Sequence, residues 1–449
     1  MFMRGPVLLA FSLVLCAAAW YSGAYSVDHR EGAPSVLQSG DQVSQDAHAA
    51  APVVQPRYSR VDALIQAELE GEPEESRDLE TIRDRVERHW AKYGMSKEDV
   101  SDVFRLKMRL RSELYAPKVW DPLFQRQKCL ISCCYTPYVD LVFDNVSFVS
   151  DVEQLLATPP VVDDTVVDFS RRAMVVYFPV PDPKRLLTKL LLKALDAGQD
   201  SKLFRNAKFV FVTSGFDRYG SPFFHCASDA SRTNAAEIAV LDHDQVHAWW
   251  VTNHECHYSH PKLYFLPLGA TEFCCSENAY VSMSRPLKQI RSEIMKGGDN
   301  ALPMDSLIFL SVGLLGPPFK VSHRENVIAA LNVSFPDVIN TYNRRMHLEF
   351  YTNISKAAFG ASPRGIASSC YRHYHTLLGA AVPVVDYHHT LEIIWDGLPV
   401  IFVRDWKDVD AKFLAAEARR LLKVKRFRWE KLFMEFWVDD VYKSASLWD

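Results

Sequence analysis

The sequence predicts an α/β fold with two Rossmann-like, doubly wound domains, and three observations lead to this prediction. The chain has 449 residues, more than one compact core usually holds, so two domains are expected. From about residue 121, continuous apolar runs alternate with helical patterns of ten or more residues, which is typical of parallel sheets covered on both faces. The alternation starts again near residue 303. We therefore expect one domain over residues 121–302 and a second over 303–449.

Residues 1–26 predict a membrane anchor. Arg4 is followed by twenty uncharged residues, Pro6 to Tyr25, and a helix of that length, at about 1.5 Å per residue, spans the roughly 30 Å core of a bilayer. A cleaved signal peptide ending near Ser22-Gly23-Ala24 is the competing interpretation. The length of the apolar segment favours the anchor. Both interpretations place the rest of the chain in the secretory lumen, and we expect a single-pass type II protein of the Golgi or endoplasmic reticulum membrane.

Cysteines and sequons agree with a luminal location. Eight of the nine cysteines follow the apolar segment, an even number that can form disulfides in an oxidising compartment, with the pairing left open. N-glycosylation sequons begin at Asn145, Asn332 and Asn353. The composition is that of a globular protein, and the net charge of −4 supplies no basic field, which argues against a nucleic-acid partner.

Two segments connect the anchor to the α/β region. Residues 27–59 are rich in Ala, Ser, Gln, Gly and Asp and predict a flexible stem. Residues 60–120 are highly charged with helical spacing, and Ser96 followed by Glu98 and Asp99 predicts a helix start. We expect a helical neck packed on the body of the protein. The favoured interpretation of this neck is a solvated helix pair with no role beyond spacing.

Apolar runs and helical periodicity place the elements of the two domains. We expect strands at residues 173–178, 208–213, 237–241, 262–266, 306–310, 347–351, 357–359, 382–385 and 399–403. We expect helices at residues 184–197, 286–295, 322–331 and 369–378, and further helices through about residue 441.

Residues 359–385 carry the strongest chemical signal. A strand is expected to end at Phe359, and Ser362-Pro-Arg-Gly365 predicts a tight turn in which glycine permits close approach of the backbone to a ligand. Ser368 or Ser369 is expected to cap the following helix. A strand, a glycine-containing turn and a helix N-terminus together predict an anion site.

Three side chains around this turn fit a nucleotide diphosphate. Arg364 can donate two parallel hydrogen bonds to a diphosphate. Arg372 and His375 are three residues apart and are expected to share one face of the helix, directed at the same ligand. The segment therefore predicts a pocket for a diphosphate and the sugars attached to it.

The same segment resembles the donor-binding half of exostosin-like glycosyltransferases, including the ribitol xylosyltransferase-related group. The motifs that carry the resemblance in this region are Ser362-Pro-Arg-Gly365, Cys370-Tyr-Arg372, Gly379 and Val382-Pro-Val384. Weaker matches follow in order along the chain: Ser214-Gly-Phe-Asp217, Trp250-Val-Thr-Asn253, His260-Pro-Lys-Leu263, Leu266-Pro-Leu-Gly269, Arg324-Glu325, Leu391, Gly397-Leu-Pro-Val400 and Val403-Arg-Asp-Trp406. The resemblance covers about residues 170 to 410.

The resemblance implies a GT-B architecture, in which the two domains face a cleft, and an enzyme that needs no metal or other cofactor. It implies a nucleotide-sugar donor, with a UDP-sugar expected, and a glycan or glycoprotein acceptor. The donor would be bound by Ser362, Arg364, Gly365, Arg372 and His375. Asn253 and His254 would lie on the acceptor side. Asp217 would be the catalytic base, with His254 or Asp242 as alternatives.

Two departures from the family pattern motivate a second hypothesis. His375 stands where the family has a glutamate, and Ser369 stands where it has an aspartate. A neutral histidine accepts only one hydrogen bond, whereas a carboxylate accepts several. The second hypothesis is therefore a catalytically inactive, glycosyltransferase-like protein that binds glycans or partner proteins.

A rival site is formed by His254, Cys256, His257 and His260. Their spacing matches neither a zincin nor a zinc finger, so a loop near the acceptor is favoured over a metal centre. His373, His388 and His389 are expected to be polar residues of the surface or cleft.

Overall fold

The computed structural model describes residues 84–124, 139–143, 147–162, 164–178, 186–213, 235–254, 259–270, 277–295, 304, 306–313, 322–338, 347–365 and 367–447. All of these belong to one compact unit, residues 57–449. The predicted anchor, the stem and the first part of the neck lie outside the described residues. Among the helices of the described ranges, none is long and apolar enough to cross a membrane.

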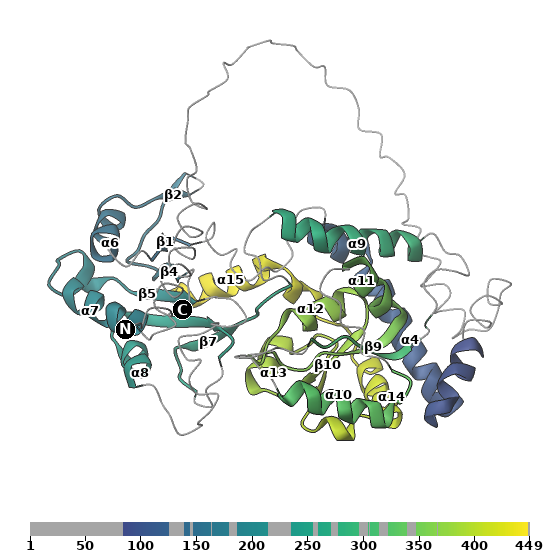
Figure 1. Ribbon diagram of the computed structural model, residues 1–449. Helices are drawn as coiled ribbons and strands as arrows, with labels where there is room; N and C mark the ends of the chain where they lie inside the picture. The colour runs from purple at the N-terminus through teal and green to yellow at the C-terminus, as the bar shows by residue number, and fades with distance from the viewer. Residues whose placement is uncertain are drawn as a thin grey trace, which may run out of the picture. The chain divides into compact units, whose positions relative to one another are not determined.

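The first sheet has five parallel strands that follow one another in chain order (Figure 1). They are β1 (Leu141–Val142), β4 (Met174–Phe178), β5 (Phe209–Thr213), β6 (Val246–Thr252) and β7 (Leu263–Leu266). A short antiparallel pair, β2 (Val161–Val162) and β3 (Thr165–Val166), precedes β4.

The two faces of this sheet belong to different cores, as the alternation along β4 shows. Met174, Val176 and Phe178 pack with α6 (Phe148–Ala157), α7 (Leu186–Gly198) and α8 (Ala235–Asp242). The intervening Val175 and Tyr177 belong to the other core, together with the C-terminal helix α15 (Met434–Ala445). Because successive side chains of a strand point to opposite faces, both faces of the first sheet are buried.

The second sheet has four parallel strands, also in chain order: β8 (Ser306–Leu310), β9 (Ala357–Ala361), β10 (Val382–Asp386) and β11 (Ile401–Val403). The helices around it are α9 (Glu277–Met295), α10 (Ser322–Ser334), α11 (His347–Lys356), α12 (Tyr371–Leu378), α13 (His389–Trp395) and α14 (Ala411–Leu422). Two parallel-sheet α/β halves are thus confirmed. The reversal of strand order that defines a doubly wound sheet is not seen among the described strands.

Two predicted strands are wrong, because residues 237–241 lie in α8 and residues 347–351 lie in α11. Short apolar runs do not distinguish strand from helix by periodicity alone. In α8 the run begins with Ala235-Ala-Glu237, and alanine and glutamate favour a helix. The strand β6 was not predicted from the sequence, although it holds the valine- and tryptophan-rich run Val246–Thr252.

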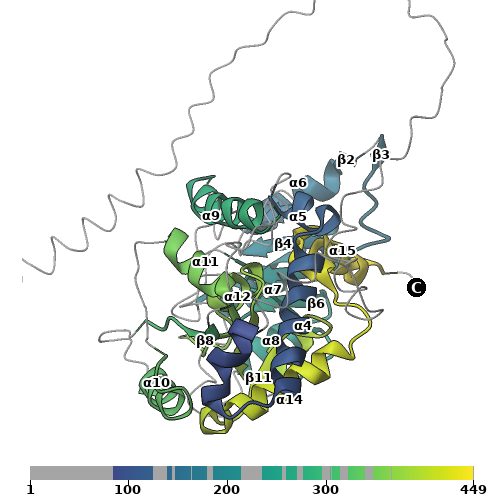
Figure 2. The same cartoon turned by 90° about the vertical axis from the view of Figure 1, so that its right-hand side faces the viewer.

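The predicted helix start at Ser96 is confirmed. Ser96 is the N-cap of α4 (Lys97–Leu114), and its side chain and that of Asp99 bond to each other's backbone N–H groups in a capping box. Helix α4 lies along α14 and contacts β9 (Figure 2). Phe104, Leu110 and Leu114 are among its buried side chains. The favoured interpretation of this segment as a solvated spacer is therefore wrong, because α4 is part of the core.

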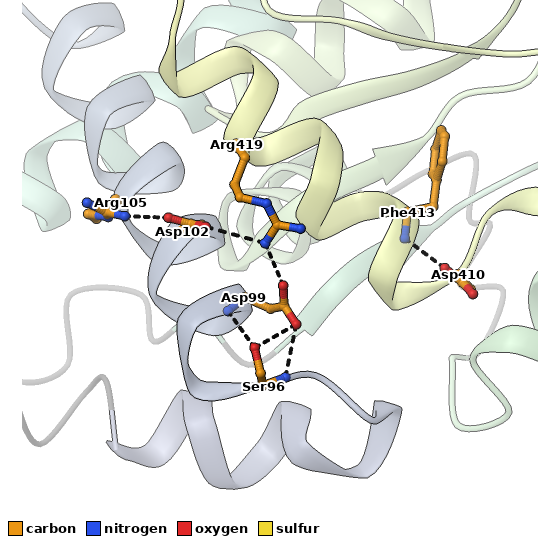
Figure 3. A network of polar contacts seen from close by, with 7 residues as sticks. All are labelled: Ser96, Asp99, Asp102, Arg105, Asp410, Phe413 and Arg419. Atoms are coloured by element: carbon orange, nitrogen blue, oxygen red, sulfur yellow. Dashed lines mark hydrogen bonds and ion pairs between the residues drawn. The ribbon is translucent and has the colours of Figure 1, made fainter.

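A network of ion pairs joins α4 to α14 at the surface (Figure 3). The Arg419 guanidinium lies 2.6 Å from Asp99 and 3.5 Å from Asp102, and Asp102 also pairs with Arg105. The arginines of these pairs reach solvent although Asp102 is buried, and ion pairs open to solvent contribute little individually. The buried side chains of α4 account for most of its attachment.

Three basic side chains of α4 bond to the carboxyl ends of three other helices. Lys107 Nζ, whose pKa is lowered by burial, donates to Ala380 O just beyond α12 (2.6 Å), and Arg111 donates to Ser355 O in α11 (2.8 Å). Arg109 donates to Leu422 O, the last residue of α14 (3.3 Å). Cations interact favourably with the negative end of a helix dipole. Helix α4 therefore stabilises the ends of helices that are remote from it in sequence.

The short elements complete the fold. They are η1 (Ala91–Tyr93), α5 (Pro117–Phe124), η3 (Phe204–Asn206), η5 (Trp406–Asp408) and η6 (Trp429–Leu432). In η6, the buried Lys431 donates to Ile393 O and Ile394 O near the end of α13, both at 3.2 Å. Burial lowers the pKa of Lys431 to about 8.

This shift predicts a pH dependence of stability. Above pH 8 the unfolded chain still carries the Lys431 proton, while the folded protein has released it, so the free energy of unfolding rises with pH. We expect the difference between wild type and Lys431→Met to shift by about 2 kcal/mol in favour of wild type between pH 7.5 and 10, measured by urea unfolding. A difference that is flat or falls over this range contradicts the prediction.

Candidate functional site

The candidate site lies at the carboxyl end of the second sheet, where Asp386 ends β10. One carboxylate oxygen accepts hydrogen bonds from His323 Nε2 (2.8 Å) and Trp406 Nε1 (2.7 Å). The other accepts the backbone N–H of Arg364 (2.5 Å). Strands β9 and β10 are neighbours, so the turn after β9 lies beside the end of β10. Asp386 thereby joins the predicted turn, α10 and η5.

Asp386 is held as a carboxylate. Its burial acts to raise the pKa, but the hydrogen bonds from His323, the Arg364 N–H and Trp406 outweigh that effect and lower the pKa below its usual range. The negative charge is therefore fixed next to the turn.

Arg324 secures the turn from the other side. Its Nε donates to Arg364 O (3.1 Å), and its Nη1 donates to Gly313 O after β8 (2.7 Å). The loops after β8 and β9 are thus tied to α10. Two of the short motifs meet at this carboxylate through the Arg364 N–H and the Trp406 side chain, and Arg324 of a third motif bonds to Arg364 O. Up to 82 residues separate these three motifs (406 − 324).

The rest of the turn is fixed by buried polar contacts. Ser362 Oγ lies 2.8 Å from His373 Nδ1, and His373 Nε2 lies 3.1 Å from Ser368 O. The Ser362 N–H donates to Val384 O of β10 (2.9 Å), and the Gly365 N–H donates to Ala367 O (3.1 Å), so neither bond closes a tight turn over residues 362–365. His373 is fully buried, so its predicted place at the surface or in a cleft is wrong.

The expected serine cap of α12 is also wrong. The N-cap is Cys370, whose side chain makes no capping bond and instead lies 3.5 Å from His373 Nδ1. Ser369 comes one residue too early, and its N–H donates to Asn253 Oδ1 (3.2 Å) at the end of β6. The other eight cysteines lie outside the described residues.

Asn253 links the first sheet to the segment before α12. It is only 3% exposed and has a φ of +53°, in the left-handed region that asparagine adopts more readily than most other non-glycine residues. Its Nδ2 has no hydrogen-bond partner among the described residues. A buried unsatisfied amide at a strand end marks Asn253 as a candidate functional position.

Arg372 and His375 share a face of α12, as their spacing predicts. The Arg372 guanidinium lies 4.5 Å from the Phe350 ring of α11, and the His375 ring lies 6.1 Å from the same ring. His375 Nε2 also lies 2.5 Å from Ala270 O, after β7. Arg372 and His375 thus contact α11 and the segment after β7. Ser362, Arg364 and Gly365 lie in the segment after β9.

The remaining predicted residues are dispersed. His254 is buried against Phe265, and Asp242 at the end of α8 pairs with His260 (3.1 Å). Asn332 is exposed on α10, and Asn353 is half-buried on α11. Asp217, Asn145, Cys256 and His257 lie outside the described residues. Within the described ranges, no group of three His, Cys, Asp or Glu side chains is arranged to hold a metal ion.

Sequence reasoning missed Asp386 and His323. A signal for Asp386 was present, because it directly follows the apolar run of β10, and ligand-binding residues of parallel sheets lie just beyond the carboxyl ends of strands. Comparison of the sequence with protein-family models and with curated proteins finds no match.

Proposed function

We propose that this chain is an exostosin-like glycosyltransferase that transfers a sugar from a nucleotide sugar, expected to be a UDP-sugar, to a glycan or glycoprotein. The observation that supports this most is the meeting of three short motifs around Asp386. Neighbouring parallel strands bring these motifs to one edge of the sheet, and ligands of parallel sheets bind just beyond the carboxyl ends of the strands.

In this proposal the turn Ser362–Gly365 holds the donor diphosphate. Asp386 and Arg324 fix its backbone, and the N-terminus of α12 directs the positive end of its dipole toward the leaving group. Arg364 adds positive charge at the turn, and Arg372 would reach the same diphosphate from α12 by leaving the Phe350 ring on which its guanidinium packs. The leaving diphosphate would then be stabilised without a cofactor. An acceptor hydroxyl, activated by Asp217, displaces the diphosphate at the sugar C1.

The finer architecture is also part of the proposal. A GT-B arrangement would assign residues 121–302 to the acceptor side and residues 303–449 to the donor side. The bond between Asn253 and Ser369 supports a site shared by the two sheets. The apolar residues 1–26 would anchor the chain in the Golgi or endoplasmic reticulum membrane, with the body in the lumen and its exposed Asn332 available for glycosylation.

One observation favours the second candidate, a catalytically inactive glycan- or partner-binding protein. His375 occupies the position of a donor-binding glutamate in the resemblance, and its Nε2 is bonded to Ala270 O. Slow release of nucleoside diphosphate from the donor without an acceptor distinguishes the candidates, because only an active enzyme hydrolyses it.

Thermal unfolding of the full-length protein with a panel of nucleotides and nucleotide sugars tests the donor site. A ligand at 100 times its dissociation constant is expected to stabilise the folded state by about 2.7 kcal/mol. We expect one nucleotide to raise the melting temperature of wild type and of Arg205→Ala, a surface arginine of the first half, but not of Arg364→Ala. If no nucleotide stabilises wild type, the proposal is wrong.

A further inference from the structure

His323 and Asp386 form an oriented imidazole–carboxylate pair that no predicted role uses. His323 is the second residue of α10, and its Nε2 bonds to the carboxylate that also holds the Arg364 N–H. The His323 side chain is 38% exposed, whereas that of Asp386 is 17% exposed. The Asp386 carboxylate is thus the more buried member of the pair, and the His323 imidazole is the more exposed one.

The bond to Asp386 determines which nitrogen of His323 remains for a ligand. An ionised carboxylate only accepts, so Nε2 carries the hydrogen of this bond. Trp406 Nε1 donates to the same carboxylate oxygen and restrains its position. The Nδ1 atom remains for another partner, and a carboxylate that fixes one ring nitrogen orients the other. When the ring is protonated, Nδ1 becomes a charged donor suited to a phosphate oxygen.

The neighbouring cation, Arg324, makes structural contacts with the backbone. Arg324, the next residue of α10, uses Nε and Nη1 to hold the backbone carbonyls of Arg364 and Gly313. His323 therefore places a titratable donor beside the turn, while Arg324 fixes the shape of that turn.

We propose that His323, positioned by Asp386, donates a hydrogen bond from Nδ1 to the diphosphate of the bound nucleotide, so that this site binds its nucleotide more tightly when the imidazole is protonated. This inference rests on the proposed donor site. It adds a ligand contact and a pH dependence that the turn and α12 alone do not supply.

Several other charged groups lie on the elements packed around His323. The elements packed around it carry Asp386 on β10, Arg364 on the turn, Arg324 and Glu325 on α10, and Asp405, Lys407 and Asp408 around η5. Carboxylates, lysine and arginine ordinarily titrate well outside pH 5.5–8.5. A change in affinity within this range that depends on residue 323 therefore reports on the imidazole.

The test is calorimetric titration of the full-length protein with UDP and with inorganic pyrophosphate between pH 5.5 and 8.5. The phosphates themselves titrate near pH 6, so each variant is compared with wild type at the same pH. We expect wild type to bind UDP about tenfold more tightly than His323→Gln at pH 5.5 and nearly equally at pH 8.5. Glutamine can still donate to Asp386, so the fold around the carboxylate is retained.

His243→Gln is the matched control, because His243 lies beside a carboxylate, that of Asp196 (3.9 Å), in the first half of the protein and has no predicted role in the site. It is expected to keep the wild-type pH profile. A His323→Gln profile that parallels wild type, or an equal loss in His243→Gln, overturns this inference while leaving the donor site intact. Absence of UDP and pyrophosphate binding by wild type at every pH overturns both the inference and the proposed function.

Discussion

A fragment that begins at Pro117, and therefore lacks α4, is expected not to fold. Six large apolar side chains of this helix are buried: Val100, Val103, Phe104, Leu106, Leu110 and Leu114. Burial of each contributes about 1.5–3 kcal/mol, and the sum of about 9–18 kcal/mol is comparable to the whole stability of a typical protein, about 5–15 kcal/mol. Removing α4 also takes Lys107, Arg109 and Arg111 from the ends of three other helices.

The measurement is cooperative thermal unfolding, followed by near-ultraviolet circular dichroism. A fragment that begins at residue 57 includes the complete compact unit and serves as the control. The shorter fragment is expected to show no cooperative transition and to aggregate. Addition of a peptide spanning residues 84–116 is expected to restore part of the signal. A fragment from Pro117 that unfolds cooperatively near the control temperature would show that α4 is an accessory spacer after all.

Local signals in the sequence predict the start of α4 but not its environment. Ser96 and Asp99 form the capping box within four residues, so their pattern is readable from the chain alone. The partners of Lys107 and Arg111 are backbone carbonyls more than 240 residues away (380 − 107 and 355 − 111). A charged helix whose basic side chains bond to remote carbonyls has the sequence of a solvated helix, which explains the wrong interpretation of the neck.

In the candidate site, local signals again predict position but not environment. Proline and glycine in Ser362–Gly365 predict a connection after β9, and this connection is present, although no bond closes a tight turn over these residues. The role of Asp386 depends on β9 and β10 being neighbours, a property of the sheet rather than of any short motif. Asn253 could not be predicted either, because its contact with Ser369 spans 116 residues and joins the two halves of the protein. The place of the connection was thus predictable, whereas the groups that hold it were not.

Asp386→Ala is expected to abolish nucleotide binding and to destabilise the protein. The substitution leaves three donors without their acceptor, namely His323 Nε2, the Arg364 N–H and Trp406 Nε1. Loss of an ionised acceptor from a largely buried network costs about 3–5 kcal/mol. The turn that holds the diphosphate then loses its support at Arg364, so we expect UDP affinity to fall at least about 100-fold.

Equilibrium unfolding in urea and UDP titration measure the two effects separately. Asp396→Ala is the matched control, because the Asp396 side chain is exposed and forms a surface ion pair with Arg428 (3.5 Å); this change is expected to cost less than about 1 kcal/mol and to leave UDP binding unchanged. The folded pKa of Asp386 is lowered, so its stabilising effect is present above the usual aspartate pKa and is lost as the pH falls through the folded value. Wild type and Asp386→Ala should therefore converge in stability toward acid pH. If Asp386→Ala binds UDP as wild type does, the carboxylate has only a structural role, and the diphosphate must bind elsewhere.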